Sequence, residues 1–386
     1  SIAVLPFVNM SGDSEQEYFS DGITEEIITA LSKTPKLFVI ARPSSFKYKG
    51  KDVDLRTVGR ELGVRYVLEG SVRKAGNRLR VTAQLIDAQR NQHLWAERYD
   101  RDLKEIFALQ DEITLRIVKA LQVKLTEGEQ ARIVGRGTDN LEVYVKVLQS
   151  REHFFRMNKQ GSMRARQLAK EAISLDPNYA AAYTILALTH MMDLWFKFTD
   201  SPEESMKMAV EAAQKALTLD DSDPRTHVGL CMLYIMQREH DKAIAAGERA
   251  VLLSPSGARA HSSLGIALMF AGRPNEAITL IKKAISLNPF PPSVYLRNLG
   301  SAYRMAGRNE DAIAEYKKSF QKNPNDLFTH LGLVVSYISL GREQEARAAA
   351  AEVLRIHPKF SLEHFAKTLP LRNQADVDHM ITSLRK

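Results

Sequence analysis

The first third of the chain alternates short apolar runs with amphipathic segments, and this pattern ends near residue 125. Continuous apolar runs, or apolar and polar residues in strict alternation, predict strands over Ile2–Phe7, Leu37–Ala41, Val64–Val72, Leu79–Ile86 and His93–Tyr99. Apolar residues at helical spacing predict helices over Tyr18–Leu31, Asp54–Leu62 and Ile106–Leu125, and Asp54 is expected to cap the second of them. This order of strands and helices is typical of a small layered α/β domain.

From Leu141 onward the pattern is helical only, and it repeats about every 34 residues. Prolines end successive repeats at Pro255, Pro289, Pro324 and Pro358. A single helix pair of this kind cannot bury its apolar faces alone, so the pairs must stack in series. Clear pairs are predicted at 224–257, 258–292, 293–326 and 327–360, with degenerate pairs at 141–179 and 180–223 and an atypical terminal pair at 361–386.

The composition shift between these regions predicts the domain organisation. Residues 126–140 contain Gly135, Gly137 and few apolar residues, so they are expected to form a linker. The sequence therefore predicts an α/β domain over 1–125, a linker over 126–140, and helical repeats over 141–386. At 386 residues the chain is also too long for one compact core.

Composition narrows the setting of the protein. Hydrophobic content of 44% and charged content of 26% are ordinary for a globular protein, and no apolar run is long enough to span a membrane. The start, SIAVLPF, is not a signal peptide and lacks a methionine, so we expect a piece of a longer protein. The lone Cys231 fits a cytoplasmic setting. The periplasm is the alternative if a membrane span precedes Ser1.

Charge and motifs point away from nucleic acid and from catalysis. The net charge of +8 is spread over both regions without a basic arm, so no direct nucleic-acid partner is expected. The sequence has no phosphate-binding loop, HExxH, CxxC pair or GxSxG elbow. No catalytic residue, metal or cofactor is therefore predicted for this chain.

One loop is a candidate ligand site. It follows the second predicted strand and contains Arg42, Ser44, Ser45 and Lys47. Loops at the carboxyl ends of strands commonly hold ligands in open α/β sheets, and hydroxyl and basic groups suit an anion. A solvated basic loop is the alternative. The nearby Asp21, Glu25 and Glu26 are expected to favour the start of a helix electrostatically rather than to act as an acid/base pair.

Four histidines share the same early position of their repeats: His227, His261, His330 and His364. Equivalent side chains in successive helix pairs lie about 10 Å or more apart, whereas zinc needs its ligands about 2 Å from one point. These histidines are therefore predicted to pack between helices rather than to bind a metal.

The first region resembles the TolB-like amino-terminal domain. The resemblance rests on SIAVLPF, EYFSDGITEEIITALS, LFVIARPSSFKYKG, ELGVRYVLEGSVRKAGNRLRVTAQLIDA, HLWAERYDRDL and FALQDEIT, in that order. It is closest to the version found in bacterial signalling proteins, between an effector domain and helical repeats. The effector in that family is usually a class III adenylate or guanylate cyclase domain, and in some members a winged-helix DNA-binding domain.

The second region resembles the tetratricopeptide repeat family, so the fold predicted is a small α/β domain followed by an all-α superhelix. The resemblance implies that the first helix of each pair lines a concave groove. The groove residues would then be Arg225, Val228, Met232, Arg259, Ile266, Met269, Val294, Arg297, Arg304, Phe328, Leu331 and Val335. Apolar residues with arginines among them predict a protein partner whose binding segment carries hydrophobic and acidic residues. The alternative is that the chain itself covers part of this face.

Together these features predict a non-catalytic regulatory and protein-interaction region of a bacterial signalling protein, an adenylate or guanylate cyclase whose catalytic domain lies outside this chain. Two alternatives stay open: the sensory half of a winged-helix transcription regulator, and a free-standing assembly scaffold. The residues before Ser1 would separate the three, because each alternative requires something different there.

Overall fold

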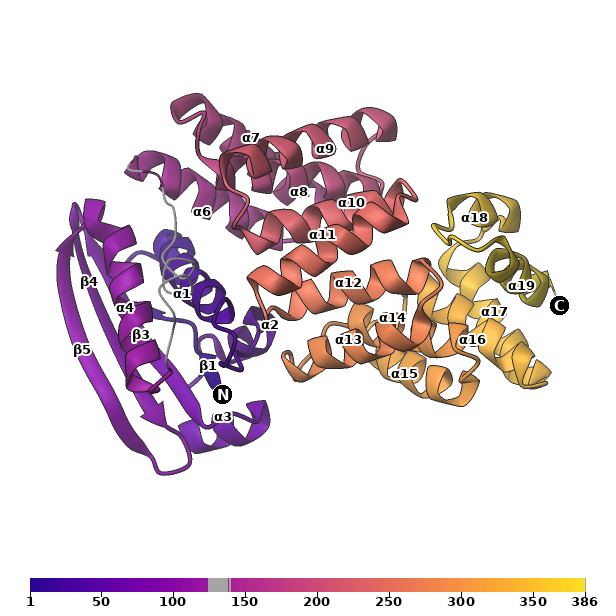
Figure 1. The fold of residues 1–386 in the computed structure, drawn as a ribbon, viewed down its shortest axis with the longest axis horizontal. Helices are drawn as coiled ribbons and strands as arrows, with labels where there is room; N and C mark the ends of the chain where they lie inside the picture. The colour runs from indigo at the N-terminus through magenta and orange to yellow at the C-terminus, as the bar shows by residue number, and fades with distance from the viewer. Residues whose placement is uncertain (124–137, 139, 386) are drawn as a thin grey trace. The chain divides into compact units, whose positions relative to one another are not determined.

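The computed structural model describes residues 1–123, 138 and 140–385 (Figure 1). These residues form two compact units. The first contains residues 1–233, 249–257 and 287–289, and the second contains 234–248, 258–286 and the chain from 290 onward. The predicted linker, 126–140, lies outside the described residues except for Thr138 and Asn140, so the predicted domain boundary stays a prediction.

The first unit begins with a mixed sheet and the helices that pack on it. We call this part, residues 1–123, the sheet domain. Its strands are β1 (Ile2–Val4), β2 (Val8–Asn9), β3 (Tyr66–Ala75), β4 (Arg78–Asp87) and β5 (Gln92–Asp102). The order is β1-β3-β4-β5, and β2 also pairs with β3. Strands β1 and β2 run parallel to β3, and the remaining pairs are antiparallel. A left-handed Gly76, at φ 57°, lies in the turn that joins β3 to β4.

One predicted strand is wrong in extent. Leu37–Ala41 makes only an isolated bridge, between Val39 and Ile2 of β1. The Ile2 amide donates to the Phe38 carbonyl, and the Ile40 amide donates to the Ile2 carbonyl. Because β1 itself is only three residues long, this segment has no longer edge to pair with. Leu37, Val39 and Ile40 are nevertheless buried, as the continuous apolar run predicts.

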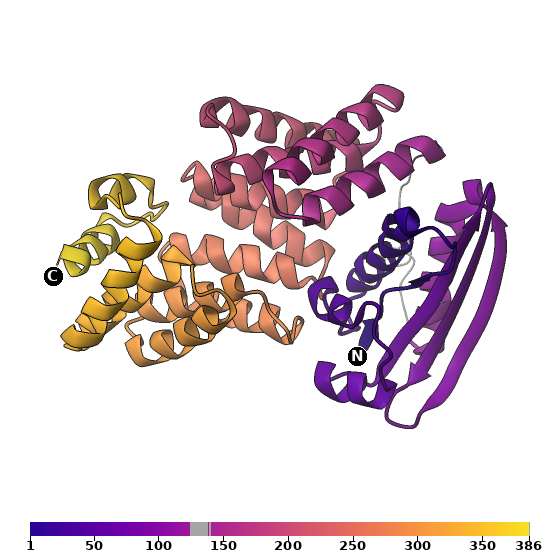
Figure 2. The same cartoon turned by 180° about the vertical axis from the view of Figure 1, so that it is seen from behind.

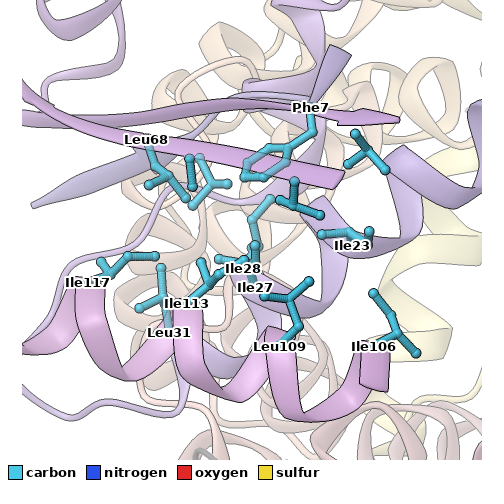
Figure 3. Packing of buried hydrophobic residues seen from close by; sticks show 14 of the residues in the cluster. Phe7, Ile23, Ile27, Ile28, Leu31, Leu68, Ile106, Leu109, Ile113 and Ile117 are labelled. Atoms are coloured by element: carbon cyan, nitrogen blue, oxygen red, sulfur yellow. The ribbon is translucent and has the colours of Figure 1, made fainter. Parts of the chain in front are cut away.

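Two long helices cover one face of the sheet. The helices of this domain are α1 (Glu17–Ser32), α2 (Arg42–Ser45), α3 (Leu55–Leu62) and α4 (Ile106–Ala120). Figure 3 shows the core between α1, α4 and the strands, where Ile23 and Ile27 of α1 meet Leu109 and Ile113 of α4. Asp54 caps α3 as predicted, because its carboxylate accepts from the amides of the first turn.

The core of the sheet domain is completed by a helix of the first repeat. Tyr144 and Leu148 of α6 (Leu141–Phe155) belong to the same buried cluster as the residues of α1 and α4. The ring of Tyr144 packs edge-on against Phe107, with centroids 4.7 Å apart, and its hydroxyl accepts from the Gln110 amide at 2.7 Å. Helices α1 and α6 approach closely at Gly22, because a Cβ there would lie 2.6 Å from Leu148.

The helical region consists of antiparallel pairs, as the 34-residue period predicts (Figures 1 and 2). In addition to α6 they are α7 (Lys159–Leu175), α8 (Ala180–Phe196), α9 (Pro202–Leu219), α10 (Pro224–Met236), α11 (His240–Leu253), α12 (Ala258–Phe270), α13 (Pro274–Ser286), α14 (Ser293–Met305), α15 (Asn309–Lys322), α16 (Leu327–Ser339), α17 (Glu343–Ile356), α18 (Leu362–Thr368) and α19 (Gln374–Arg385). None of the described helices combines the length and apolar character needed to cross a bilayer.

Small residues allow the helices of the second unit to pack closely. Tyr316 of α15 is fully buried, and its ring lies next to Gly300 of α14 and Gly332 of α16. A Cβ at Gly332 would lie 2.3 Å from the Tyr316 ring. By contrast, among the described residues a Cβ at Gly229 of α10, in the first unit, would contact Leu188 alone, at an ordinary 3.6 Å.

These environments predict opposite signs for two glycine-to-alanine substitutions. We expect Gly332→Ala to lower the free energy of unfolding by about 1–3 kcal/mol, because the methyl group overpacks Tyr316. Gly229→Ala, the matched control, should raise it by about 0.5–1 kcal/mol, because alanine favours the helix and finds room. Scanning calorimetry of both variants measures the changes, and equal effects would contradict the packing described for Tyr316.

Candidate functional site

The candidate site is the contact between the sheet domain and the repeats within the first unit, which we call the seam. On the sheet-domain side it contains Glu26, Ser32, Leu37, Ala41 and Ser44; on the repeat side it contains Arg151, Arg225, Ser254, Ser256, Leu287 and Asn288. The repeat side is built from helix α6 and from the segments that precede α10, α12 and α14. Equivalent segments of successive repeats thus contact one domain.

The segment before α12 contacts the carboxyl end of α1. The Ser32 and Ser254 hydroxyls share a buried hydrogen bond of 2.7 Å. The Ser256 amide donates to the Ser32 carbonyl at 3.2 Å, and its hydroxyl donates to the Leu37 carbonyl. The bond from the Ser256 amide satisfies the Ser32 carbonyl at the end of α1, where a helix leaves carbonyls unpaired.

The segment before α14 contacts the start of α2. The Ala41 amide donates to the Leu287 carbonyl at 2.8 Å. The Ser44 hydroxyl donates to the side-chain oxygen of Asn288, and both residues are buried. The backbone of one repeat loop is therefore paired directly with the backbone of the sheet domain.

A partly buried ion cluster lies between these contacts and α6. The Glu26 carboxylate pairs with Arg151 of α6 and, at 3.1 Å, with Arg225 at the start of α10. The Asp223 carboxylate forms an ion pair with the Arg225 guanidinium at 3.0 Å. The side chains of Glu26, Arg225 and Arg151 are only 24%, 25% and 10% exposed. Each charge in this cluster depends on its partners, because water screens it little.

The charges of this cluster determine one another's protonation. Burial alone would raise the pKa of Glu26, but Arg225 and Arg151 outweigh it and hold that pKa well below its ordinary value. Burial also opposes ionisation of Asp223, and Arg225 lowers its pKa in the same way. The pKa of Arg225 is correspondingly raised despite its burial, chiefly by Asp223 and Glu26. All of these groups are therefore charged at neutral pH.

The predicted ligand loop takes a different form. Ser44 and Ser45 lie in α2 and are fully buried, so neither hydroxyl can receive an anion from solvent. That part of the prediction is wrong, because both serines are buried and the Ser44 hydroxyl is bonded to Asn288 of a repeat segment. Lys47 is exposed. Arg42 is half-buried, and its guanidinium carbon lies 3.9 Å and 4.1 Å from the ring centroids of Phe46 and Phe155.

Arg42 lines a cavity of about 210 Å³ beside the seam. Its walls come from α1, α2 and α6 and carry acidic and basic groups in similar number: Asp21, Glu25, Glu152, Arg42, Arg151 and Arg156. Most of these are paired with one another or with neighbours, as Arg42 is with Glu25 at 3.3 Å and Asp21 with Lys49 at 2.7 Å. The cavity is therefore close to neutral and does not present the basic surface that was predicted.

The predicted groove residues have different environments. Within the first unit, Val228 is buried, Met232 is half-buried, and Arg225 belongs to the ion cluster, so Arg225 is not available to a partner as predicted. In the second unit Arg259 and Phe328 are exposed, Ile266, Val294, Arg297 and Arg304 are half-buried, and Met269, Leu331 and Val335 are buried. Arg297 pairs with Asp326 at 3.1 Å.

Leu331 and Val335 are covered by the carboxyl-terminal helices. Both belong to a cluster with Phe365 of α18 and with Val377, Met380 and Ile381 of α19. The prediction that these two residues line an open groove is therefore wrong, and the alternative of coverage by the chain itself applies there.

The histidines are packed rather than arranged around a metal. His227 and His330 each hydrogen-bond at 2.9 Å to a backbone carbonyl six residues earlier, that of Asp221 and Pro324 respectively. His261 is also buried, whereas His364 is exposed, so the packing prediction is confirmed for three of the four. Among the described residues, no group of three or more metal-ligating side chains gathers at one point.

Sequence reasoning missed the partners of the ion cluster. Glu26 was expected to act locally at the start of a helix, but it lies within α1 and pairs with arginines 125 and 199 residues away. Arg151 carried no signal beyond its place in a degenerate repeat. The inward position predicted for Arg225 was the one usable indication, since a half-buried arginine needs a carboxylate partner.

Family models match three parts of the chain. Residues 1–116 match the second domain of HilA/YgeH-like transcriptional regulators. Residues 262–326 and 303–366 match tetratricopeptide repeats. The repeats are thus confirmed. The TolB-like resemblance is not shown by these matches, which assign the HilA/YgeH-like domain to the same residues.

A curated relative is "Putative adenylate cyclase 3" of Rhizobium meliloti (strain 1021), which is 51% identical over 243 residues. The match takes in 63% of this chain and 41% of that protein, so the chain spans less than half of its relative's length.

Solved structures are also similar to part of the chain. A pilF structure from Pseudomonas aeruginosa has a TM-score of 0.45 and 18% identity, over 61% of this chain and 97% of that one. The TTC0263 structure from Thermus thermophilus has a TM-score of 0.40 and 17% identity, over 51% and 98%. These TM-scores add nothing to what the family models and the helix pairs already show.

The seam predicts a large cost for removing Glu26. In Glu26→Ala, Arg151 loses its carboxylate partner and Arg225 keeps only Asp223. We therefore expect the free energy of unfolding to fall by about 2–4 kcal/mol. The fluorescence of the two tryptophans reports unfolding on the two sides of the seam. A Trp195→Phe background leaves Trp95 as the reporter in the sheet domain, and a Trp95→Phe background leaves Trp195 as the reporter in the repeats. Urea unfolding followed by each tryptophan measures the change.

The matched control is Glu152→Ala, which removes a more exposed ion pair with Arg156. Exposed ion pairs of this kind contribute about 0–1 kcal/mol to the free energy of unfolding. A loss in Glu26→Ala no larger than in this control would show that the ion cluster does not stabilise the seam.

The lowered pKa values also predict a pH dependence. Because the folded-state pKa of Glu26 lies below its ordinary value of 4.5, its contribution is fully present above that pH and is lost as the pH falls below it. The difference in unfolding free energy between the wild type and Glu26→Gln should therefore be constant from pH 8 to 5 and shrink below about 4.5. Urea titrations at several pH values test this, and a difference that grows in acid would contradict it.

Proposed function

We propose that this chain is the non-catalytic regulatory and protein-interaction region of a bacterial signalling protein, an adenylate or guanylate cyclase whose catalytic domain lies outside the chain. The observation that supports this best is the 51% identity over 243 residues with a protein named as an adenylate cyclase. Because this chain accounts for 41% of that relative, the remainder has room for a catalytic domain.

The seam supports a role in relaying a signal. The sheet domain shares its hydrophobic core with α6 and is hydrogen-bonded to the segments that precede α12 and α14. A change in one of these repeat segments therefore shifts groups that are bonded to α1 or α2. Packed cores transmit such shifts rather than absorb them, since they have few voids.

The repeats supply the interaction surface in this proposal. Tetratricopeptide matches cover residues 262–366, and inner-face residues such as Arg259 and Phe328 are exposed. A partner segment with apolar anchors and acidic residues suits the exposed Arg259 and the aromatic ring of Phe328. Arg297 is a weaker candidate than the sequence implied, because Asp326 already pairs with it.

A second function is favoured by a different observation. The match of residues 1–116 to the second domain of HilA/YgeH-like regulators supports the sensory half of a transcription regulator. In that case the part of the protein outside this chain would bind DNA. The two proposals share the same regulatory region and differ only in the output domain.

The cyclase proposal predicts that the repeats control the output through the seam. In the longer protein that carries this chain, we expect deletion of residues 180–386 to change the rate of cyclic AMP formation from ATP. This deletion retains α6, so the core of the sheet domain stays complete. Arg225→Ala should change the rate in the same direction, because it disconnects α10 from Glu26.

Arg249→Ala is the matched control, because it removes an exposed ion pair between Arg249 of α11 and Asp221, which precedes α10. It should leave the rate unchanged. A protein that forms cyclic AMP at a rate unaffected by either the deletion or Arg225→Ala would refute the regulatory role. A protein that forms no cyclic AMP and shifts promoter DNA in a gel would favour the transcription regulator.

A further inference from the structure

The carboxyl-terminal segment, Ser361–Arg385, lies across the first helices of the repeats in the second unit. Helix α19 packs on α16, where Val377, Met380 and Ile381 cover Leu331 and Val335. The Arg304 guanidinium of α14 contacts the Met380 sulfur at 3.9 Å. The Arg372 amide donates to the carbonyl of Phe270, the last residue of α12, at 2.9 Å. The segment therefore occupies the face predicted to receive a partner.

The contact of α19 has the chemistry of an amphipathic helix in an apolar groove. Val377, Met380, Ile381 and Leu384 follow the i, i+3, i+4, i+7 spacing of one helical face. The first three are 7–8% exposed, so they are covered but lie near the surface of the cluster. The inner face of α16 thus binds the apolar stripe of a helix.

The polar contacts that hold this segment are exposed. Arg238 donates to the carbonyls of Lys367 and Leu369, at 2.6 and 2.9 Å. Arg372 pairs with Asp241 at 2.8 Å, and these side chains are 52% and 79% exposed. Exposed ion pairs contribute little to stability. The segment is therefore held mainly by its apolar contacts, and a helix that presents a similar apolar stripe would compete for the same face.

Arg304 indicates what a competing helix would add. Its Nε is buried without a hydrogen-bond acceptor, and no carboxylate pairs with it in the part of the chain that the structure describes. A cavity of about 300 Å³ lies beside it, lined also by His379 and Asp376 of α19. Asp376 lines this cavity without an ion pair to Arg304 among the described residues. Because His379 lines the same cavity, we expect a carboxylate at its position to reach the guanidinium and form a charge-assisted hydrogen bond.

We propose that the inner face of α14–α16 binds an amphipathic partner helix that carries an acidic residue opposite Arg304, and that α18–α19 occupies this face until the partner displaces it. This rests on the protein-binding role proposed for the repeats and adds the kind of partner and its competitor. The partner resembles α19 in its apolar stripe and differs from it at the position of His379.

Two synthetic peptides test the proposal. One copies residues 370–385, and the other carries His379→Glu; both are labelled for fluorescence anisotropy. The protein is the full chain with Val377→Asp and Ile381→Asp, which release α19 but leave the inner face unchanged. We expect this released chain to bind the His379→Glu peptide about tenfold more tightly than the native copy. The wild-type chain should bind both far more weakly, because its own segment competes at high effective concentration.

Controls address specificity and folding. Adding Arg304→Ala to the released chain should abolish the tenfold preference, and a peptide with Ile381→Asp should not bind. If the released chain fails to fold, as circular dichroism would show, Arg238→Ala with Arg372→Ala loosens the segment and keeps every apolar residue. This variant should bind the His379→Glu peptide more tightly than the wild type does.

The proposal is overturned if folded variants bind neither peptide, or bind both equally whether or not Arg304 is present. Such a result leaves the regulatory proposal standing when cyclic AMP formation still responds to Arg225→Ala. Conversely, peptide binding together with an unresponsive output would support this surface and refute the relay.

Discussion

The hydrophobic core of the sheet domain closes only with the first helix of the repeats, and the rest of the first unit depends on this packing. Tyr144 and Leu148 of α6 fill the end of the core between α1 and α4, and Gly22 lets α1 and α6 approach. Once α6 is fixed there, Arg151 on the same helix reaches Glu26 of α1. The buried charges are tolerated because they are paired.

The repeat period explains how one small domain contacts several repeats. Each helix pair ends in a segment that leads to the next first helix, and stacking places equivalent segments side by side. Three such segments contain Asp223, Ser256 and Asn288. Ser256 and Asn288 hydrogen-bond directly to the sheet domain, and Asp223 pairs with Arg225, which in turn pairs with Glu26. The sheet domain thus contacts the repeats at regular intervals, through groups whose partners lie in α1, in α2 and in the turn between them.

Much of the fold follows from local patterns in the sequence. The apolar stripes of α1 and α4, the Asp54 cap and the helix pairs from α10 to α17 were all predicted, because each depends on residues close together in the chain. The site depended on long-range contacts instead. Burial of Ser44 results from Asn288, 244 residues away, and nothing local marks a serine that a distant loop will cover.

The same limit explains the errors on the inner face. Repeat periodicity identified which residues of α16 point inward, and Leu331 and Val335 are indeed apolar and buried. It could not show that α19 returns to cover them, since the terminal helices lie outside the period. The one indication in the sequence was that the terminal pair, 361–386, departs from the repeat pattern and has an apolar stripe of its own.

Native-state hydrogen exchange tests most directly whether the sheet domain and the first repeat form one cooperative unit. We expect the slowest amides of α1, α4 and α6 to share one free energy of opening and to respond equally to low concentrations of denaturant. Amides of α6 that open at a distinctly lower free energy than those of α1 and α4 would contradict the shared core.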